Sequence, residues 1–254
     1  MSIDTKFHII IPCYNCDQWI EKCLSSVVDQ KYTNWEAVVI DDGSTDETSN
    51  IISKFIDENR QHKNKIRIIK NEKNFGSPLM SIVTGTQTTN ANDLDVIVNL
   101  DGDDWLSDID VLFHLSTVYS NPNILMTYGQ YEPSSKKYKD YCRPIPNFNT
   151  YRKSKKWVTS HLRTYRKVLF DNIRDEDLRD EDGSYFECAG DLALIFPMIE
   201  MAGAERVQFI PKVLYIYNDQ NLMNEMKIKK EKQLGIAQKI RNKECYKLLI
   251  LDEK

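Results

Sequence analysis

Four short apolar runs, each followed by a segment with helical spacing, constrain the fold of this chain more than any other feature. The runs are Phe7–Ile11, Trp35–Ile40, Ile66–Ile69 and Asp95–Leu100. Uninterrupted apolar runs of this length are typical of strands that are buried on both faces. Strands that alternate with helices predict a parallel sheet with helices on both sides. The expected fold class is therefore α/β.

A polar cluster lies beyond the carboxyl end of each of these four runs. The clusters occupy residues 12–15, 41–46, 74–78 and 101–104. In open α/β sheets, ligands bind at the carboxyl ends of the strands. Because all four clusters fall at those ends, we predict that they form one shared binding site.

The last cluster, Asp101-Gly102-Asp103-Asp104, places three carboxylates within four residues. Neighbouring anions repel one another and resist burial, so a cation is expected among them. Carboxylates are hard oxygen ligands and favour a divalent metal ion, and Gly102 would allow the tight turn that brings Asp101 and Asp103 together. A plain acidic turn, in which Asp104 or Ser107 caps the next helix, is the alternative.

Local signals place several further elements. Ser44 and Glu47 fit a capping box, and Ser77-Pro78 predicts the start of a helix that runs to about Thr88. The second half is less regular. Its expected elements are a helix at 109–119, a strand at 124–128, a long loop at 129–156, an apolar segment from Asp191 that is kinked or interrupted at Pro197, short strands at 207–210 and 213–217, and a Lys-rich helical tail from Asn224.

The composition limits which partners and which cellular compartment we expect for this protein. The chain has 34 basic and 38 acidic residues, so no basic field indicates a nucleic acid or an anionic membrane. No apolar run approaches the ~20 residues that cross a bilayer, and the polar start lacks a signal-peptide pattern. Cys13-x-x-Cys16 has no second pair to complete a zinc site, and Tyr14-Asn15 between the sulfurs disfavours thioredoxin-like chemistry. We expect reduced thiols in the cytoplasm.

Four motifs resemble those of a known family. They are Ile9–Asn15, Val39–Asp46, Asn74–Gly76 and Asp101–Asp104. In this order and spacing, over residues 6–128, they closely resemble the family-2 inverting glycosyltransferases of the GT-A fold. The resemblance implies a Rossmann-like, mixed and mostly parallel sheet flanked by helices. It further implies one GT-A domain, with a nucleotide-sugar-binding half at 1–128, an acceptor-binding half at 129–223 and a C-terminal helical extension at 224–254.

The resemblance also implies a nucleotide-diphosphate sugar as donor, most often UDP-linked, and Mn²⁺ or Mg²⁺ as cofactor. Asp103 would bind the metal directly, Asp101 would meet the ribose or the metal through water, and Asp104 would orient its neighbours. Asp41 would accept a hydrogen bond from the uracil ring N–H. The other donor contacts that we expect are Pro12, Tyr14, Asn15, Asp42, Asn74, Gly76, Gly102 and His161.

Several of these residues also have a structural interpretation. Tyr14 could pack within a loop, and Asp41 and Asp42 could cap a helix. Asn74 and Gly76 could form a plain turn. A lone histidine such as His161 could be a hydrogen-bonded structural residue.

Asp191 is the expected catalytic base. Inverting transfer requires a carboxylate within ~3 Å of the acceptor hydroxyl. The family's acidic motif is usually Glu-Asp, whereas this chain has Ala189-Gly190-Asp191. A helix N-cap is the alternative for Asp191.

The third metal contact stays open in the sequence. The family often places a histidine in a C-terminal loop, but this chain has none near residues 215–218. Asn224 or Lys227 could take its place.

These observations predict a metal-dependent inverting glycosyltransferase that transfers a hexose to a hydroxyl acceptor on a glycan, protein or lipid. A non-catalytic sugar-nucleotide or glycan-binding module and a sugar nucleotidyltransferase are the alternatives. The Lys-rich tail allows either a homodimer or packing back on the domain. The C-terminal half faintly resembles family members associated with large DNA viruses, and for a viral protein the compartment would be the host cytoplasm.

Overall fold

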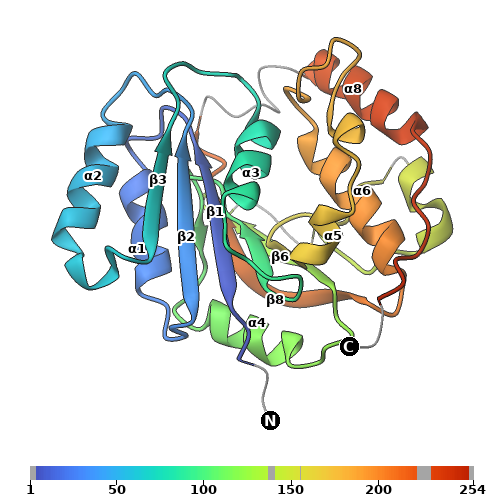
Figure 1. The fold of residues 1–254 in the computed structure, drawn as a ribbon, viewed down its shortest axis with the longest axis horizontal. Helices are drawn as coiled ribbons and strands as arrows, with labels where there is room; N and C mark the ends of the chain where they lie inside the picture. The colour runs from blue at the N-terminus through green and yellow to red at the C-terminus, as the bar shows by residue number, and fades with distance from the viewer. Residues whose placement is uncertain (1–3, 137–140, 155, 222–229, 252–254) are drawn as a thin grey trace.

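One mixed sheet organises the molecule (Figure 1). The computed structural model describes residues 4–136, 141–154, 156–221 and 230–251. The strand order is β3-β2-β1-β4-β7-β6-β8-β5. The bounds of the strands are β1 Phe7–Cys13, β2 Trp35–Asp41, β3 Ile66–Lys70, β4 Val96–Asn99, β5 Trp105–Leu106, β6 Met126–Pro133, β7 Arg163–Arg166 and β8 Val207–Tyr217.

The first half of the sheet is parallel and the second half is mixed. β1 pairs in parallel with β2 and β4, and β2 pairs in parallel with β3. β7 lies antiparallel between β4 and β6, while β6 and β8 are parallel and β5 is antiparallel to β8. The four strands expected in the first half are all present, and the predicted α/β fold class is confirmed.

Helices cover both faces of the sheet. Their bounds are α1 Ile20–Val28, α2 Thr48–Glu58, α3 Pro78–Gln87, α4 Val111–Tyr119, α5 Lys167–Asp171, α6 Gly190–Ala202 and α8 Lys230–Asn242, with 3₁₀ turns η1 Arg60–His62, η2 Phe148–Lys153 and η3 Asp175–Leu178. Successive side chains of a strand point to opposite faces. Ile9 and Ile11 accordingly pack with α1, α2 and α4, whereas Ile10 packs with α3 and α6.

Two local predictions at helix starts had different outcomes. The Ser77 hydroxyl accepts the Met80 N–H at 3.1 Å and Pro78 opens α3, as predicted. The capping box at Ser44 was wrong, because α2 begins only at Thr48, whose N–H donates to Asp46. The Ser44 hydroxyl instead accepts the Asn15 N–H at 3.0 Å. A contact with a distant loop therefore replaces the local cap.

The second half departs further from the sequence pattern. Residues 129–133 continue β6 and are not a loop, and the two short strands around Pro211 are one strand with a register shift opposite Gly129 and Gln130. Pro197 lies inside a continuous α6. Ten of the thirteen residues of α6 are buried, and this packing on all sides holds the helix through the proline. The sequence did not predict β7 at all.

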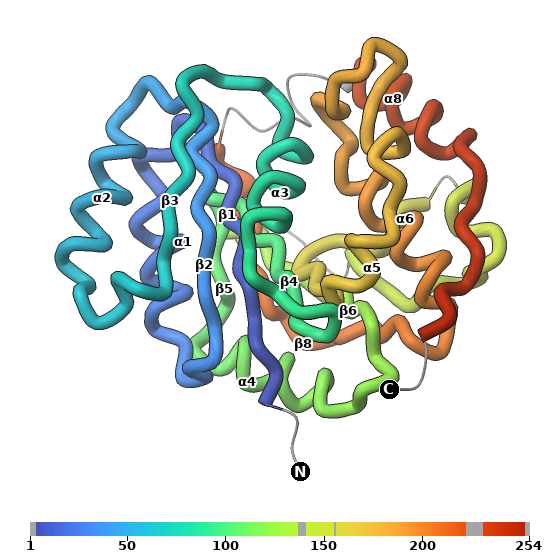
Figure 2. The backbone as a smooth tube through the Cα atoms, in the orientation of Figure 1, coloured from blue at the N-terminus to red at the C-terminus, as the bar shows by residue number. Residues whose placement is uncertain are grey.

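The C-terminal helix α8 packs back on the domain. Ile236 and Ile240 are buried in the core that contains α6, and Figure 2 shows α8 beside α6. Arg152 in η2 pairs with Glu200 at 2.6 Å and donates to the Ile240 carbonyl at 3.1 Å. The expected helix start at Asn224 lies outside the described residues. Within the described ranges, no helix has both the length and the apolar character to cross a bilayer.

Candidate active site

The carboxyl ends of β1, β2 and β4 meet, and they bring three of the polar clusters together. The Gly102 N–H donates to the Pro12 carbonyl at 2.9 Å, and the Asp42 N–H donates to the Cys13 carbonyl at 2.9 Å. A Cβ atom on Gly102 would lie 2.5 Å from Cys13 Cβ. Only glycine therefore allows the 101–104 loop to lie this close to β1.

Asn15 ties the first of these loops to the second. It has a positive φ of 48°, and its Oδ1 accepts the Thr45 N–H at 2.9 Å. The neighbouring Tyr14 side chain is 40 % exposed. The pair thus combines a fixed backbone with an aromatic ring that solvent, or a ligand, can reach.

Asp41 and Asp42 are both buried and both bind protein groups. Asp41 accepts from the Ser44 N–H and the Ser49 hydroxyl. A carboxylate oxygen can accept two hydrogen bonds, so each Asp41 oxygen has the capacity for a second donor although the residue is 0 % exposed. Asp42 accepts from the N–H groups of Phe75 and Gly76 at 3.1 and 3.2 Å and from Asn71 at 2.7 Å. Asp42 thereby holds the remaining cluster, residues 74–78 with Asn74 and Gly76, against the other three clusters.

The carboxylates of the 101–104 loop are held by neutral donors. Asp104 is 1 % exposed and accepts the Asn218 N–H at 2.6 Å and the Tyr215 hydroxyl. Asp103 accepts from Asn221 Nδ2 at 2.8 Å, and Asp101 accepts from the Tyr215 hydroxyl at 3.4 Å. The alternative that Asp104 or Ser107 caps a helix was wrong, because α4 begins at Val111 after Asp110.

Burial raises the pKa of all three carboxyls. Burial and then the charge of Asp103 raise the pKa of Asp101 to about 6. Burial also raises the pKa of Asp103, and burial with the charges of Asp103 and Asp101 holds the pKa of Asp104 well above its ordinary value. Each anion is thus destabilised by desolvation or by its neighbours, and a cation would relieve this cost.

These groups would suit a divalent cation whose remaining ligands come from a substrate and water. Among the described residues, no three His, Cys, Asp or Glu side chains form a complete metal cluster. Mg²⁺-type sites commonly use one or two carboxylates and take their remaining ligands from substrate phosphates and water. The buried Asn218 Nδ2 next to this loop has no acceptor in the described part of the chain, so it offers a donor for an anionic oxygen.

Asn221 occupies the region where the resemblance suggested a third metal contact. It touches Asp103, whereas Asn224 and Lys227 lie outside the described residues. Tyr215, Asn218 and Asn221 all come from the end of β8 and the segment after it. No sequence signal marked these three side chains as site residues, because the sequence predicts only a short strand at 213–217 there and lacks the histidine that the resemblance led us to expect.

Asp191 lies in the first turn of α6, on the same side of the molecule as the carboxylate loop. Its charge is among the causes that raise the pKa of Asp101, after burial and Asp103. Its Oδ2 accepts Arg163 Nη1 at 3.0 Å, and its Oδ1 accepts the Leu192 N–H. The N-cap alternative was wrong, since the residue before α6 is Ala189 and no side chain caps the helix.

Gly190 lies directly before Asp191, at the position where the resemblance led us to expect a glutamate. A Cβ atom there would lie 2.6 Å from Leu79 Cβ in α3. The close packing of α6 on α3 therefore leaves no room for a glutamate. Asp191 is left as the acid at the start of α6.

His161 lies between the base candidate and the carboxylate loop. Its ring stacks on Tyr215 at 4.5 Å, and its Nδ1 is 3.4 Å from Arg163 Nη2. Burial, assisted by the positive charge of Arg163, holds the pKa of His161 well below its ordinary value. The imidazole is therefore neutral near pH 7, and Nδ1 can accept from the guanidinium.

Comparison with protein families matches residues 8–175 to glycosyl transferase family 2. The chain belongs to this family. GlyA, a glycosyltransferase of Streptococcus pneumoniae, is 32% identical over 108 residues, which are 42% of this chain and 14% of GlyA. The Escherichia coli UDP-Glc:alpha-D-GlcNAc-diphosphoundecaprenol beta-1,3-glucosyltransferase WfgD is 33% identical over 132 residues, which are 51% of this chain and 47% of WfgD. The chain thus spans less than half of either relative.

Solved glycosyltransferases show the same GT-A fold. Staphylococcus aureus TarS 1–349 in complex with UDP-GlcNAc superposes with a TM-score of 0.67 at 19% identity, covering 93% of this chain and 65% of TarS. A mannosyltransferase of Pyrobaculum calidifontis in complex with GDP-Man and Mn²⁺ gives 0.65 at 17% identity, covering 95% of this chain and 66% of that protein. At these identities the likeness establishes the fold of this family-2 glycosyltransferase.

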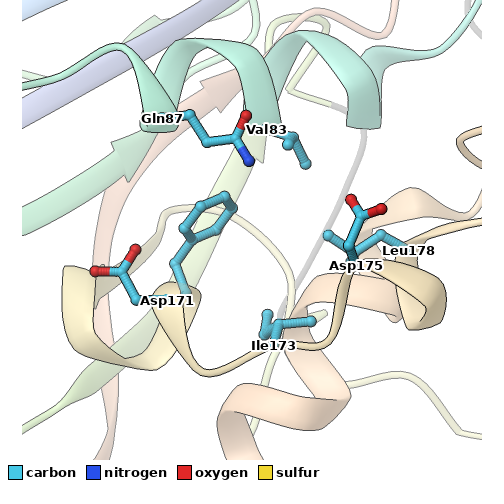
Figure 3. Close-up of a pocket in the computed structure, with 7 residues that line it drawn as sticks. Val83, Gln87, Asp171, Ile173, Asp175 and Leu178 are labelled. Carbon is cyan, nitrogen blue, oxygen red and sulfur yellow. The ribbon is translucent and has the colours of Figure 1, made fainter.

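A separate small pocket lies between α3, α5 and η3 (Figure 3). Val83, Ile173 and Leu178 contribute apolar side chains to its lining, and Asp171 and Asp175 line it as well. The volume of the pocket is about 140 Å³. Lys167 pairs with Asp171, and Arg179 pairs with Asp175. These carboxylates are already neutralised within the protein, so the pocket offers no charge for the reaction.

Proposed function

We propose that this protein is a metal-dependent inverting glycosyltransferase that moves a hexose from a UDP-linked sugar to a hydroxyl acceptor. The observation that carries the proposal is the ion pair of Asp191 with Arg163 at 3.0 Å, because Arg163 is paired in the sheet with Asn99, two residues before the carboxylate loop. This contact supports a site with a base candidate on one side and the carboxylate loop on the other. The complexes of TarS with UDP-GlcNAc and of the Pyrobaculum mannosyltransferase with GDP-Man and Mn²⁺ support it by analogy.

The donor would lie across the four loops. Pro12, Tyr14 and Asn15 would surround the base and ribose, and Asp41 would accept from the uracil N–H. Asp103 and Asp101 would hold Mn²⁺ or Mg²⁺, which when bound neutralises the diphosphate and stabilises it as a leaving group. Asn74, Gly76 and Gly102 would allow the backbone to approach the donor.

Asp191 would act as the general base. The acceptor oxygen forms a bond to the anomeric carbon from the face opposite the diphosphate, and the bond from that carbon to the diphosphate oxygen breaks. The hydroxyl proton passes to the Asp191 carboxylate. Each Asp191 oxygen has one protein partner, so each keeps a lone pair for this proton.

Titration calorimetry of UDP with and without Mn²⁺ tests the donor site. We expect binding that requires the ion and that Asp103→Asn removes, while Asp171→Asn in the separate pocket leaves it unchanged. UDP that does not bind in the presence of Mn²⁺ contradicts the proposal.

Incubation with a panel of UDP-sugars and hydroxyl acceptors, read by released UDP and by NMR of the anomeric proton, tests the reaction. A product whose anomeric configuration is opposite to that of the donor supports inversion, and retention contradicts it. Binding without UDP release would favour the non-catalytic module.

The remaining expectations stay predictions. They are the division into donor and acceptor halves at residue 128, the class of acceptor and a homodimer, which light scattering after gel filtration tests. All six cysteines lie in the described residues and are free thiols, five of them buried, which supports the cytoplasm as compartment.

A further inference from the structure

Arg163 is a cation in the interior of the site. It begins β7 and pairs with Asn99, the last residue of β4, so the strand register places it beside the start of the carboxylate loop. The residue is only 8 % exposed. A buried guanidinium is costly unless it is paired and hydrogen-bonded, so its partners indicate what it does.

Its partners come from both sides of the site. Nη1 donates to Asp191 at 3.0 Å, and Nη2 lies 3.4 Å from His161 Nδ1. The His161 ring stacks on Tyr215, whose hydroxyl donates to Asp104 and Asp101. A continuous chain of contacts therefore links the base candidate to the carboxylate loop through Arg163.

We propose that Arg163 is a positioning residue that clamps the Asp191 carboxylate toward the acceptor and holds it in fixed register with the carboxylate loop. This inference rests on the proposed glycosyl transfer and identifies a residue that acts through the base. His161 would hold the guanidinium in place, because its neutral imidazole accepts a hydrogen bond from Arg163 Nη2. A neutral ring does not compete with Arg163 for the Asp191 carboxylate.

The clamp would restrict the motion of the Asp191 side chain. The Asp191 side chain is 36% exposed, so without Arg163 only the hydrogen bond from the Leu192 N–H would restrain it among the contacts described above. A misplacement of about 1 Å at a reacting group can reduce a rate about 10²-fold. The residue before Asp191 is Gly190, which has no carboxylate that could also pair with the Arg163 guanidinium.

A double-mutant cycle on transfer tests this. Arg163→Met should lower kcat about 10²-fold, with the KM for the UDP-sugar and the affinity for UDP with Mn²⁺ unchanged. Arg163→Lys, which keeps the charge but offers a single donor group, should recover part of kcat. With Mn²⁺ saturating, the Arg163→Met, Asp191→Asn double variant should have a kcat no lower than that of Asp191→Asn, because the clamp acts on kcat through that carboxylate.

A matched control is Arg179→Met, which removes an exposed arginine–aspartate pair outside the site and should leave kcat unchanged. A wild-type kcat in Arg163→Met, or rate losses that simply add in the double variant, overturns the clamp. If Arg163→Met does not fold, Arg163→Lys decides by the same cycle with Asp191→Asn. The proposed function is judged separately from the clamp. It stands if the wild type transfers the sugar and Asp191→Asn abolishes this transfer. It is refuted if the wild type shows no transfer.

Discussion

Asp191 and the Asp101–Asp104 loop are both acidic, but they are held by different kinds of partner. Asp191 has a guanidinium at 3.0 Å and a partly exposed side chain. Asp103 and Asp104 are held by the amide of Asn221, the hydroxyl of Tyr215 and a backbone N–H. Neutral donors fix a carboxylate in place without cancelling its charge. The difference indicates that Asp103 and Asp104 have no cationic side chain bonded to them within the described residues, while the charge of Asp191 is balanced by Arg163.

The largest expected effect separates the two groups by function. Asp191→Asn should reduce transfer about 10³-fold and leave Mn²⁺-dependent UDP binding intact, because a general base contributes to the rate and not to donor binding. Asp103→Asn should reduce UDP binding itself. Initial rates and titration calorimetry on both variants provide the check, and the comparison fails if the two variants lose the same step.

The response to pH and metal should come from the loop. The pKa of Asp101 is about 6 in the folded protein, above that of an unfolded aspartate near 3.9. The folded state therefore binds more protons between these values, so this group lowers stability as pH rises from about 4 to about 6. Thermal unfolding should show Mn²⁺ stabilising the protein at pH 7 and much less at pH 5. Equal stabilisation at both pH values would contradict this assignment.

Tyr215 should contribute to both stability and metal binding. Tyr215→Phe removes the hydroxyl that donates to Asp104 and Asp101, and an unsatisfied buried acceptor costs about 1–3 kcal/mol. Urea unfolding should report that loss, and Mn²⁺ should restore part of it by binding the same carboxylates. Tyr32→Phe is the control, since its hydroxyl bonds Asp4 far from the loop. A Tyr215→Phe protein as stable as the wild type would show that the hydroxyl does not support the loop.

Two glycine variants test how α6 presents Asp191, and their effect is on stability alone. Gly190→Ala places a Cβ atom 2.6 Å from Leu79 Cβ, and such overpacking costs about 1–3 kcal/mol. Gly235→Ala in α8 meets nothing within 4 Å and should stabilise the protein by up to about 1 kcal/mol through helix propensity. Urea midpoints of the two variants should shift in opposite directions. A neutral Gly190→Ala would mean that α3 does not fix the start of α6.

Local patterns were enough for the first half of the chain. The Phe7–Cys13 and Trp35–Asp41 strands and the helix that starts after Ser77 follow from apolar runs and a cap, because neighbouring residues decide such elements. Ser44 shows the limit of this reasoning. The capping box predicted there was wrong, because α2 begins at Thr48 and the Ser44 hydroxyl accepts a tertiary hydrogen bond from the Asn15 N–H.

The sequence by itself determined the parallel half of the sheet, the four polar clusters at its carboxyl edge and the candidates Asp103 and Asp191. Only the tertiary structure decided their partners. Arg163 reaches Asp191 across 28 residues and Tyr215 reaches Asp104 across 111, because β7 enters the sheet antiparallel beside β4 and β8 returns along β6. Periodicity indicates which face of a strand is buried, but it contains no information on which distant strand becomes its neighbour.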